Sequence, residues 1–270
     1  MANTVRNTEN QNKKPWPTWD NVSNEECIEL ARIIAKYVKF LHPNIIQCIV
    51  KDNESKRGFF EDYLSRNSIE PKLYLWDNSP CCFPGIRRHS GKQEIYLFKE
   101  KKSAKKKKIK INDAIALDDN SFPKQIWSFV FRGVPFNNEG PFGYTLAHLI
   151  DHKKNNNRMK KEFEFAEDKL FEKPFYGLFT CASNTIYIPS NLVKPTDFNG
   201  KIRIWLIKKA FSLYGSVCNL VPPFAKLKEN IDSQLDEIKL NQNCIDGELN
   251  NVDVFLKYRE DKIKKVLSGL

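Results

Sequence analysis

The sequence predicts an α+β protein. Apolar residues at helical spacing mark segments near both ends of the 270-residue chain, whereas its middle carries short stretches typical of strands. A strand, a loop, a second strand and a helix are expected in that order between about 140 and 217. With 41% apolar residues, the chain can build one large or two modest domains around a sizeable core.

Four segments follow from these patterns. We expect a helical N-terminal unit over 1–70, a small sheet with a basic loop over 71–139, a compact core over 140–217 and a helical C-terminal segment over 218–270.

The N-terminal unit begins with a clear helix signal. Ser23 and Glu26 match a capping box, and the apolar residues after them recur at helical spacing, which predicts a helix from about 24 to 41. His42 is expected at the end of this helix. Two further helices are expected over 44–51 and 54–66.

The second segment predicts short strands at 73–76, 94–98 and 109–111. Residues 99–108 contain seven lysines and cannot bury themselves, so we expect a solvated loop or hairpin tip. Such runs often serve solubility alone, yet on a protruding loop they can also contact a phosphate backbone. The candidates for DNA contacts are Arg87, Arg88, Lys105, Lys106, Lys107 and Lys108.

Periodicity predicts the remaining elements. A short aromatic helix is expected near 122–131, and Phe163, Ala166 and Leu170 share one face of a helix expected over 158–173. The other expected elements are strands at 144–150, 175–181 and 185–188 and helices at 201–217, 223–241 and 250–267.

The charge favours a polyanionic partner. The net charge is +11, and residues 220–270 carry eight Lys/Arg against nine Asp/Glu, so the excess lies in the rest of the chain. Lysines near phosphates release condensed counterions and give sequence-independent affinity for nucleic acid. A lysine-rich composition inherited from a low-GC genome would give the same charge without that role.

The cysteines and the absence of long apolar runs favour a reduced, cytoplasmic protein without a membrane segment. Seven cysteines are scattered along the chain, and Cys81 and Cys82 are adjacent rather than in the C-x-x-C spacing of structural zinc sites. Glycine-rich phosphate-binding loops are also absent from the sequence.

One segment carries the residue types of a small metal-dependent nuclease site. His148 ends an apolar strand, Asp151 and His152 follow it, and Asn184 precedes a second strand. Hydrolysis of a phosphodiester needs a base that activates water, a divalent cation that stabilises charge and a group that orients the base. Histidine, carboxylate and asparagine can supply these roles.

These stretches resemble the HNH (ββα-metal) endonuclease family. Residues 147–151 look like the first half of its motif, and residues 184–197 are similar to the second half. The resemblance covers about 55 residues and implies an HNH-like ββα-metal core that requires Mg²⁺ or another divalent cation. It implies that His148 is the general base and that Asn184 orients the His148 ring through a hydrogen bond.

Two positions depart from the family's pattern. The acidic ligand usually precedes the histidine, where this chain has Ala147, so Asp151 is the nearest carboxylate for the metal. The third motif residue falls at Val193. Asn191 can replace it in a shifted register, His152 can supply the ligand, or the site does not cut; Lys194 is a candidate phosphate contact.

Other interpretations of the same residues stay open. Singly, a histidine on an apolar strand is commonly a core residue, and asparagine is common at turns. His148 and His152 lack the glutamate of the zinc-protease helix, because Leu149 follows the first histidine. The tripeptide 237–239 matches one element of a PD-(D/E)xK nuclease, but it lies in a charged segment.

We therefore expect an endonuclease of restriction type that cuts double-stranded DNA, with recognition supplied by the regions that flank its small core. Cutting both strands of a palindromic site would favour a homodimer, with apolar residues of 250–267 in the interface or, equally, in the core. The alternative is a non-catalytic nucleic-acid-binding protein with a degenerate ββα fold.

Overall fold

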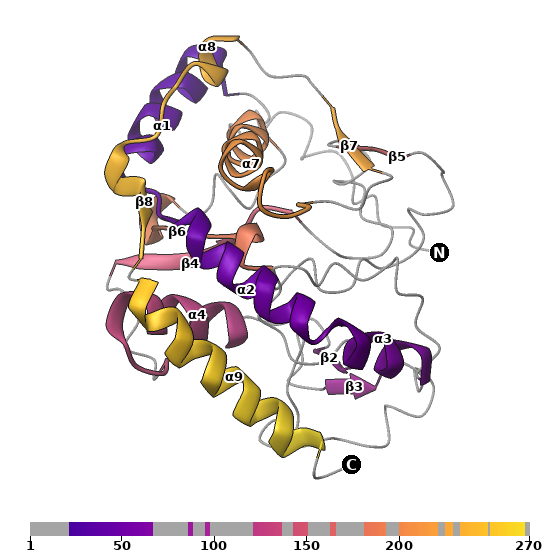
Figure 1. The fold of residues 1–270 in the computed structure, drawn as a ribbon. Coiled ribbons are helices and arrows are strands. Elements are labelled where there is room, and N and C mark those ends of the chain that lie inside the picture. Colours follow the sequence, from indigo (N-terminus) through magenta and orange to yellow (C-terminus); the bar gives the residue numbers. More distant parts are fainter. Residues whose placement is uncertain are drawn as a thin grey trace, which may run out of the picture.

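Helices surround a short two-stranded ribbon in the computed structural model of the chain. The strands β4 (Tyr144–His148) and β6 (Thr185–Pro189) lie between α7 (Lys201–Tyr214) on one side and α4 (Ser121–Arg132) and α9 (Val252–Leu267) on the other (Figure 1). This mixture of helices and small sheets confirms the α+β class. The residues that the structure describes are 22–66, 86–88, 95–97, 121–136, 143–150, 163–165, 181–192, 200–220, 225–228, 233–247 and 249–267.

The first helix begins as the sequence predicts. In α1 (Asn24–Tyr37), the Ser23 side chain accepts a hydrogen bond from the Glu26 amide, and the Glu26 carboxylate accepts one from the Ser23 amide. The predicted end near 41 is wrong by four residues. Val38 leaves the helical region with ψ at 144°, because Lys39 and the residues after it join strands.

His42 caps the next helix instead of ending the first. It is the N-cap of α2 (Pro43–Ser55), where its Nδ1 accepts a hydrogen bond from the Asn44 amide at 3.2 Å. α3 (Arg57–Arg66) follows, so the two further helices of this region are confirmed.

Short strand pairs connect the two ends of the chain. β1 (Phe40–Leu41) runs parallel to β8 (Ile245–Asp246), and the backbone of Lys39 bridges to Tyr187 of β6 with bonds of 2.8 and 3.0 Å. The N-terminal region and β8 are thereby joined edge to edge with the β4–β6 ribbon.

The ribbon itself has the predicted order and an antiparallel register. Tyr144 lies opposite Pro189 and His148 lies opposite Thr185, and the helix α7 begins after Gly200. Aromatic residues at helical spacing produce α4 where a short helix was expected, and α9 matches the last predicted helix.

Two predicted helices are wrong. β5 (Phe163–Phe165) lies within the helix expected over 158–173, and it pairs antiparallel with β7 (Ala225–Leu227), which lies within the helix expected over 223–241. Phe163 is buried and its neighbour Glu164 is exposed, as expected for successive residues of a strand. In the second region only α8 (Ser233–Asp236) is α-helical among the described residues.

The basic segment has one described strand pair. β2 (Ile86–Arg88) is antiparallel to β3 (Ile95–Leu97), which confirms the strand expected at 94–98. The strands expected at 73–76 and 109–111, the lysine run at 99–108 and most of the strand expected at 175–181 lie outside the described residues. The 3-10 helices among the described residues are η5 (Ala182–Asn184), η6 (Ser190–Leu192), η7 (Gln242–Cys244) and η8 (Leu249–Asn251).

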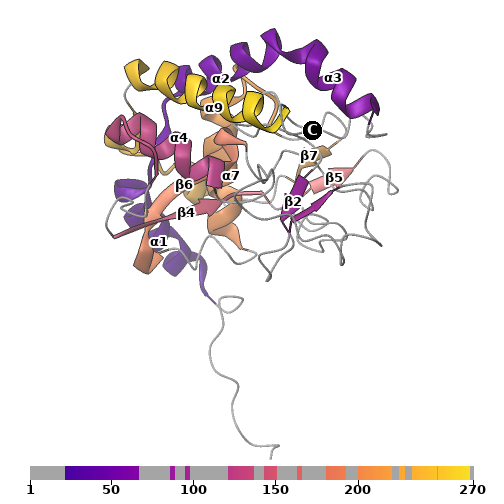
Figure 2. The same cartoon turned by 90° about the horizontal axis from the view of Figure 1, so that it is seen from below.

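All four predicted segments contribute to one hydrophobic core. Figures 1 and 2 both show α9 beside α2 and over α4. The ring of Phe255 on α9 lies 5.8 Å from that of Phe129 on α4, and Val252 is fully buried, so these two apolar residues of α9 serve the core. Arg259 is also buried and pairs with Asp52 of α2; burial lowers its pKa to about 10, so it stays charged at neutral pH.

Candidate functional site

The β4–β6 ribbon places His148 at the end of a strand, with its side chain half buried. Directly opposed residues of an antiparallel pair point to the same face, so His148 shares a face with Thr185 and, two residues along, with Tyr187. Trp127 of α4 covers this face. Its indole Nε1 donates to the Thr185 hydroxyl at 3.2 Å, and its ring lies 4.7 Å from that of Tyr187.

Asn184 holds the chain that leaves His148. It is 2% exposed, and its Oδ1 accepts from the Ile150 amide at 2.8 Å while its Nδ2 donates to the Ile150 carbonyl at 2.9 Å. Its own carbonyl accepts from the Leu149 amide at 2.9 Å. The structure therefore brings His148 and Asn184 together, with these bonds directed at backbone; the bond from Asn184 to the His148 ring stays a prediction.

Arg203 adds a buried cation to this cluster. It lies in the first turn of α7, is 2% exposed, and its Nε donates to the Leu149 carbonyl at 2.6 Å. Arg203 was not among the residues predicted from the sequence. The available signal was an arginine between Ile202 and Trp205 on a helix with apolar residues on several sides. A buried arginine in such a helix needs a hydrogen-bond or ion-pair partner.

Asn191 lies at the other end of the ribbon. It is exposed in η6, next to Ser190, whose amide donates to the Gly143 carbonyl at 2.7 Å. Gly143 and His148 are separated by the length of β4, about 14 Å or more for strand geometry. The structure thus does not bring Asn191 to His148, and a metal ligand shared by these two residues is not supported.

The other predicted site residues lie outside the part of the chain that the structure describes. These are Asp151, His152, Lys194 and Lys105 to Lys108, and for Arg87 and Arg88 only the backbone in β2 is described. Within the described ranges, no three His, Cys, Asp or Glu side chains gather in a way that could hold a metal ion. The described residues alone therefore do not fit a Mg²⁺ site, and the metal ligands expected from the sequence that remain are Asp151 and His152.

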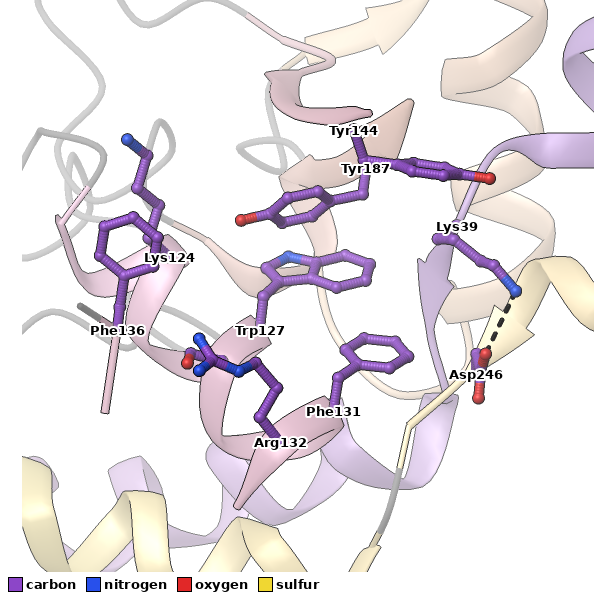
Figure 3. A pocket seen from close by; sticks show the side chains of 10 residues that line it. Lys39, Lys124, Trp127, Phe131, Arg132, Phe136, Tyr144, Tyr187 and Asp246 are labelled. Carbon is purple, nitrogen blue, oxygen red and sulfur yellow. Dashed lines mark hydrogen bonds and ion pairs between the residues drawn. The ribbon is translucent and has the colours of Figure 1, made fainter. Parts of the chain in front are cut away.

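A pocket of about 230 Å³ opens on the α4 side of the ribbon (Figure 3). Its aromatic lining comes from both elements and the loop after α4. The rings of Trp127 and Phe131 are stacked at 5.2 Å with an interplanar angle of 5°. The aromatic residues of the pocket are Trp127, Phe131, Phe136, Tyr144 and Tyr187.

Charged side chains stand around this pocket. The Lys39 amine pairs with the Asp246 carboxylate at 3.2 Å, as Figure 3 shows, and the Lys124 amine lies 5.1 Å from the centre of the Phe136 ring. Arg132 is the third cation of the lining. Burial raises the pKa of the Tyr187 hydroxyl to about 12, so this side chain is neutral and can donate a hydrogen bond at physiological pH.

Comparisons with protein-family models, curated proteins and solved structures find no match to the chain. None of the helices in the described part of the chain has both the length and the apolar character needed to cross a membrane.

Proposed function

We propose that the chain is an endonuclease of the HNH type that hydrolyses phosphodiester bonds in double-stranded DNA with a divalent cation such as Mg²⁺, in the manner of a restriction enzyme. The observation that carries the proposal is the β4–β6 ribbon, in which His148 at the strand end lies beside Asn184 and is followed in sequence by the helix α7. This strand, strand and helix order is the one that the resemblance implies.

The surroundings of His148 support a role that needs a fixed position. Asn184 and Arg203 hold the backbone of the two residues after His148, and both are almost fully buried. A catalytic group works only if its reach to the substrate is reproducible, and a rigid buried shell supplies that precision. The half-buried His148 side chain keeps contact with the surface.

In this proposal His148 is the general base. Its neutral imidazole accepts a proton from the water that attacks the phosphorus, the bond from phosphorus to the leaving sugar oxygen breaks, and that oxygen takes up a proton from solvent. A divalent cation, when bound, would stabilise the negative charge that develops on the phosphate. The buried Arg203 helps to position this base, because it holds the carbonyl of the next residue, Leu149.

The second candidate is a nucleic-acid-binding protein that does not cut. The separation of Asn191 from His148 favours it, because the shifted-register replacement for the residue expected at Val193 is then lost. This candidate keeps the charge-dependent binding and lacks hydrolysis.

A cleavage assay separates the two candidates. Supercoiled plasmid and phage DNA are incubated with the protein in Mg²⁺, Mn²⁺ or Ni²⁺, and the His148→Ala variant is compared with His42→Asn. Removing a general base lowers the rate about 10²–10⁴-fold, whereas asparagine at position 42 is a good helix N-cap and leaves cleavage unchanged. DNA that stays intact with every metal, while binding persists, selects the non-catalytic candidate.

A further inference from the structure

The geometry points to the aromatic pocket as a binding site for an unstacked nucleobase of a nucleic-acid strand. This inference rests on the proposed nucleic-acid substrate and adds to it a place where a base leaves the stack. Enzymes and single-strand binders recognise such bases with aromatic rings, while basic side chains hold the phosphates on either side.

The size and lining of the pocket fit a single planar ring. Its volume of about 230 Å³ lies below the roughly 300–1,000 Å³ of sites that enclose whole drug-sized ligands. Phe131 is 38% exposed although its ring is stacked on Trp127, so an aromatic surface already faces solvent at the opening. An exposed ring that is held by a buried ring is a ready stacking platform.

The charge around the pocket favours a ligand that carries phosphate. Among the described residues of the lining, Lys39, Lys124 and Arg132 are the cations and Asp246 is the carboxylate. The Lys39 amine is occupied by that carboxylate at 3.2 Å, whereas the Lys124 amine lies 5.1 Å from the centre of the Phe136 ring, where it can also meet a phosphate. An uncharged aromatic metabolite or an apolar peptide would gain nothing from this lysine.

The position of the pocket connects it with His148. Tyr187 lies opposite Leu146, two residues before His148 on β4 and on the same face of the ribbon. Two residues of strand span about 7 Å, the scale of neighbouring nucleotides along a strand. A base in the pocket would therefore position its strand with a backbone phosphate toward His148.

Binding to two matched strands tests this site without any need for cleavage. One labelled single-stranded DNA oligonucleotide carries its bases, and the other is the same length of phosphate backbone with abasic sites throughout, so both carry the same charge. Fluorescence anisotropy in EDTA at one fixed salt concentration gives the Kd of each. We expect the wild-type protein to bind the base-bearing strand about five- to a hundred-fold more tightly, the range expected for stacking of a base on an aromatic residue.

Phe131→Ala should remove most of this preference. Tyr37→Ala is the matched control, because Tyr37 is 50% exposed on α1 and does not line the pocket. Phe136→Ala repeats the test on the opposite side of the pocket, and circular dichroism verifies that each variant is folded.

The outcomes separate this inference from the proposed nuclease activity. A base preference that depends on Phe131, together with intact plasmid in every metal, supports the pocket and rejects the nuclease. If the protein cleaves DNA but binds both strands equally, the pocket is overturned and the nuclease stands. The same holds if it cleaves DNA and the Phe131→Ala variant keeps the preference for the base-bearing strand. Failure to bind either strand also overturns it.

Discussion

At the scale of single residues, the side-chain amide of Asn184 controls the path of the chain after His148. It satisfies both the amide and the carbonyl of Ile150 in a site from which water is largely excluded. Buried backbone groups without partners are costly, so few side chains can replace this amide. A serine or alanine at this position would leave at least one of the two groups without its present partner.

Asn184→Ala should therefore lower the free energy of unfolding by about 2–5 kcal/mol, since each unsatisfied buried group costs about 1–3 kcal/mol. Asn191→Ala is the control. It should change the free energy of unfolding by less than about 0.5 kcal/mol, because substitutions of exposed residues rarely remove stabilising contacts. Urea denaturation followed by circular dichroism measures both. Equal effects of the two substitutions would show that the Ile150 contacts contribute little to stability.

The sequence predicted the proximity of His148 and Asn184 but not the buried contact of Arg203. Proximity followed from the order of two strands, because an antiparallel pair with this order brings the end of the first to the start of the second. The direction of the Asn184 amide toward Ile150, and the separation of Asn191 from His148 along the ribbon, depend on register. Register is set by the packing of faces that a single sequence does not reveal.

At the scale of elements, a glycine between β8 and α9 lets helices from both halves of the chain pack closely. Gly247 has φ at +125°, and a Cβ built on it would lie 2.3 Å from Cγ1 of Val130 on α4 and 2.5 Å from Cδ1 of Ile45 on α2. Both distances are far below van der Waals contact. The joint between β8 and α9 therefore requires the absence of a side chain as well as an unusual backbone conformation.

Gly247→Ala should destabilise the protein more than Gly143→Ala. Gly143 also has positive φ, at +78°, but a Cβ added there would meet no atom within 4 Å, so that substitution costs about 1–2 kcal/mol from backbone strain alone. At Gly247 overpacking adds about 1–3 kcal/mol. The two free energies of unfolding from urea denaturation give the difference, and a larger loss at Gly143 would contradict this account of the joint.

The elements that the sequence predicted correctly have long periodic patterns or explicit caps. α1 with its Ser23 capping box and α9 each bury one face that repeats over several turns, and α4 has apolar residues buried around the helix. β5 and β7 have three residues each, which is too short for an alternating pattern to outweigh the helical spacing of their neighbours. Their pairing is a long-range contact, which local periodicity does not reveal.

At the scale of the whole molecule, the core and the charge are distributed differently. Residues from all four predicted segments share one hydrophobic core, so the ribbon and its flanking helices form a continuous packed unit. The positive excess instead lies in residues before 220, since the C-terminal segment is close to balanced. Binding of a polyanion should thus depend on local lysines rather than on the net charge alone.

Replacing Lys105, Lys106, Lys107 and Lys108 with glutamine should weaken DNA binding and its dependence on salt. Each phosphate contact contributes about 0.9 to the slope of log Kd against log salt concentration, because a bound lysine releases condensed counterions. The slope measured by anisotropy between about 50 and 200 mM salt should fall by about 0.9 for every lysine of this run that contacts DNA.

A variant with the same change in charge provides the control for that prediction. Four exposed lysines lie elsewhere, on α1, on α2, after α8 and on α9: Lys36, Lys51, Lys239 and Lys257. Replacing them with glutamine removes an equal number of positive charges. If the run at 105–108 positions the protein on DNA, only its replacement should change the salt dependence of log Kd appreciably. The slope reports the number of phosphates that lysines contact, and charges farther away contribute little. Equal slopes for the two variants would mean that the lysine run serves solubility, and the search for the DNA-binding face would move to the ribbon and the cations around its aromatic pocket.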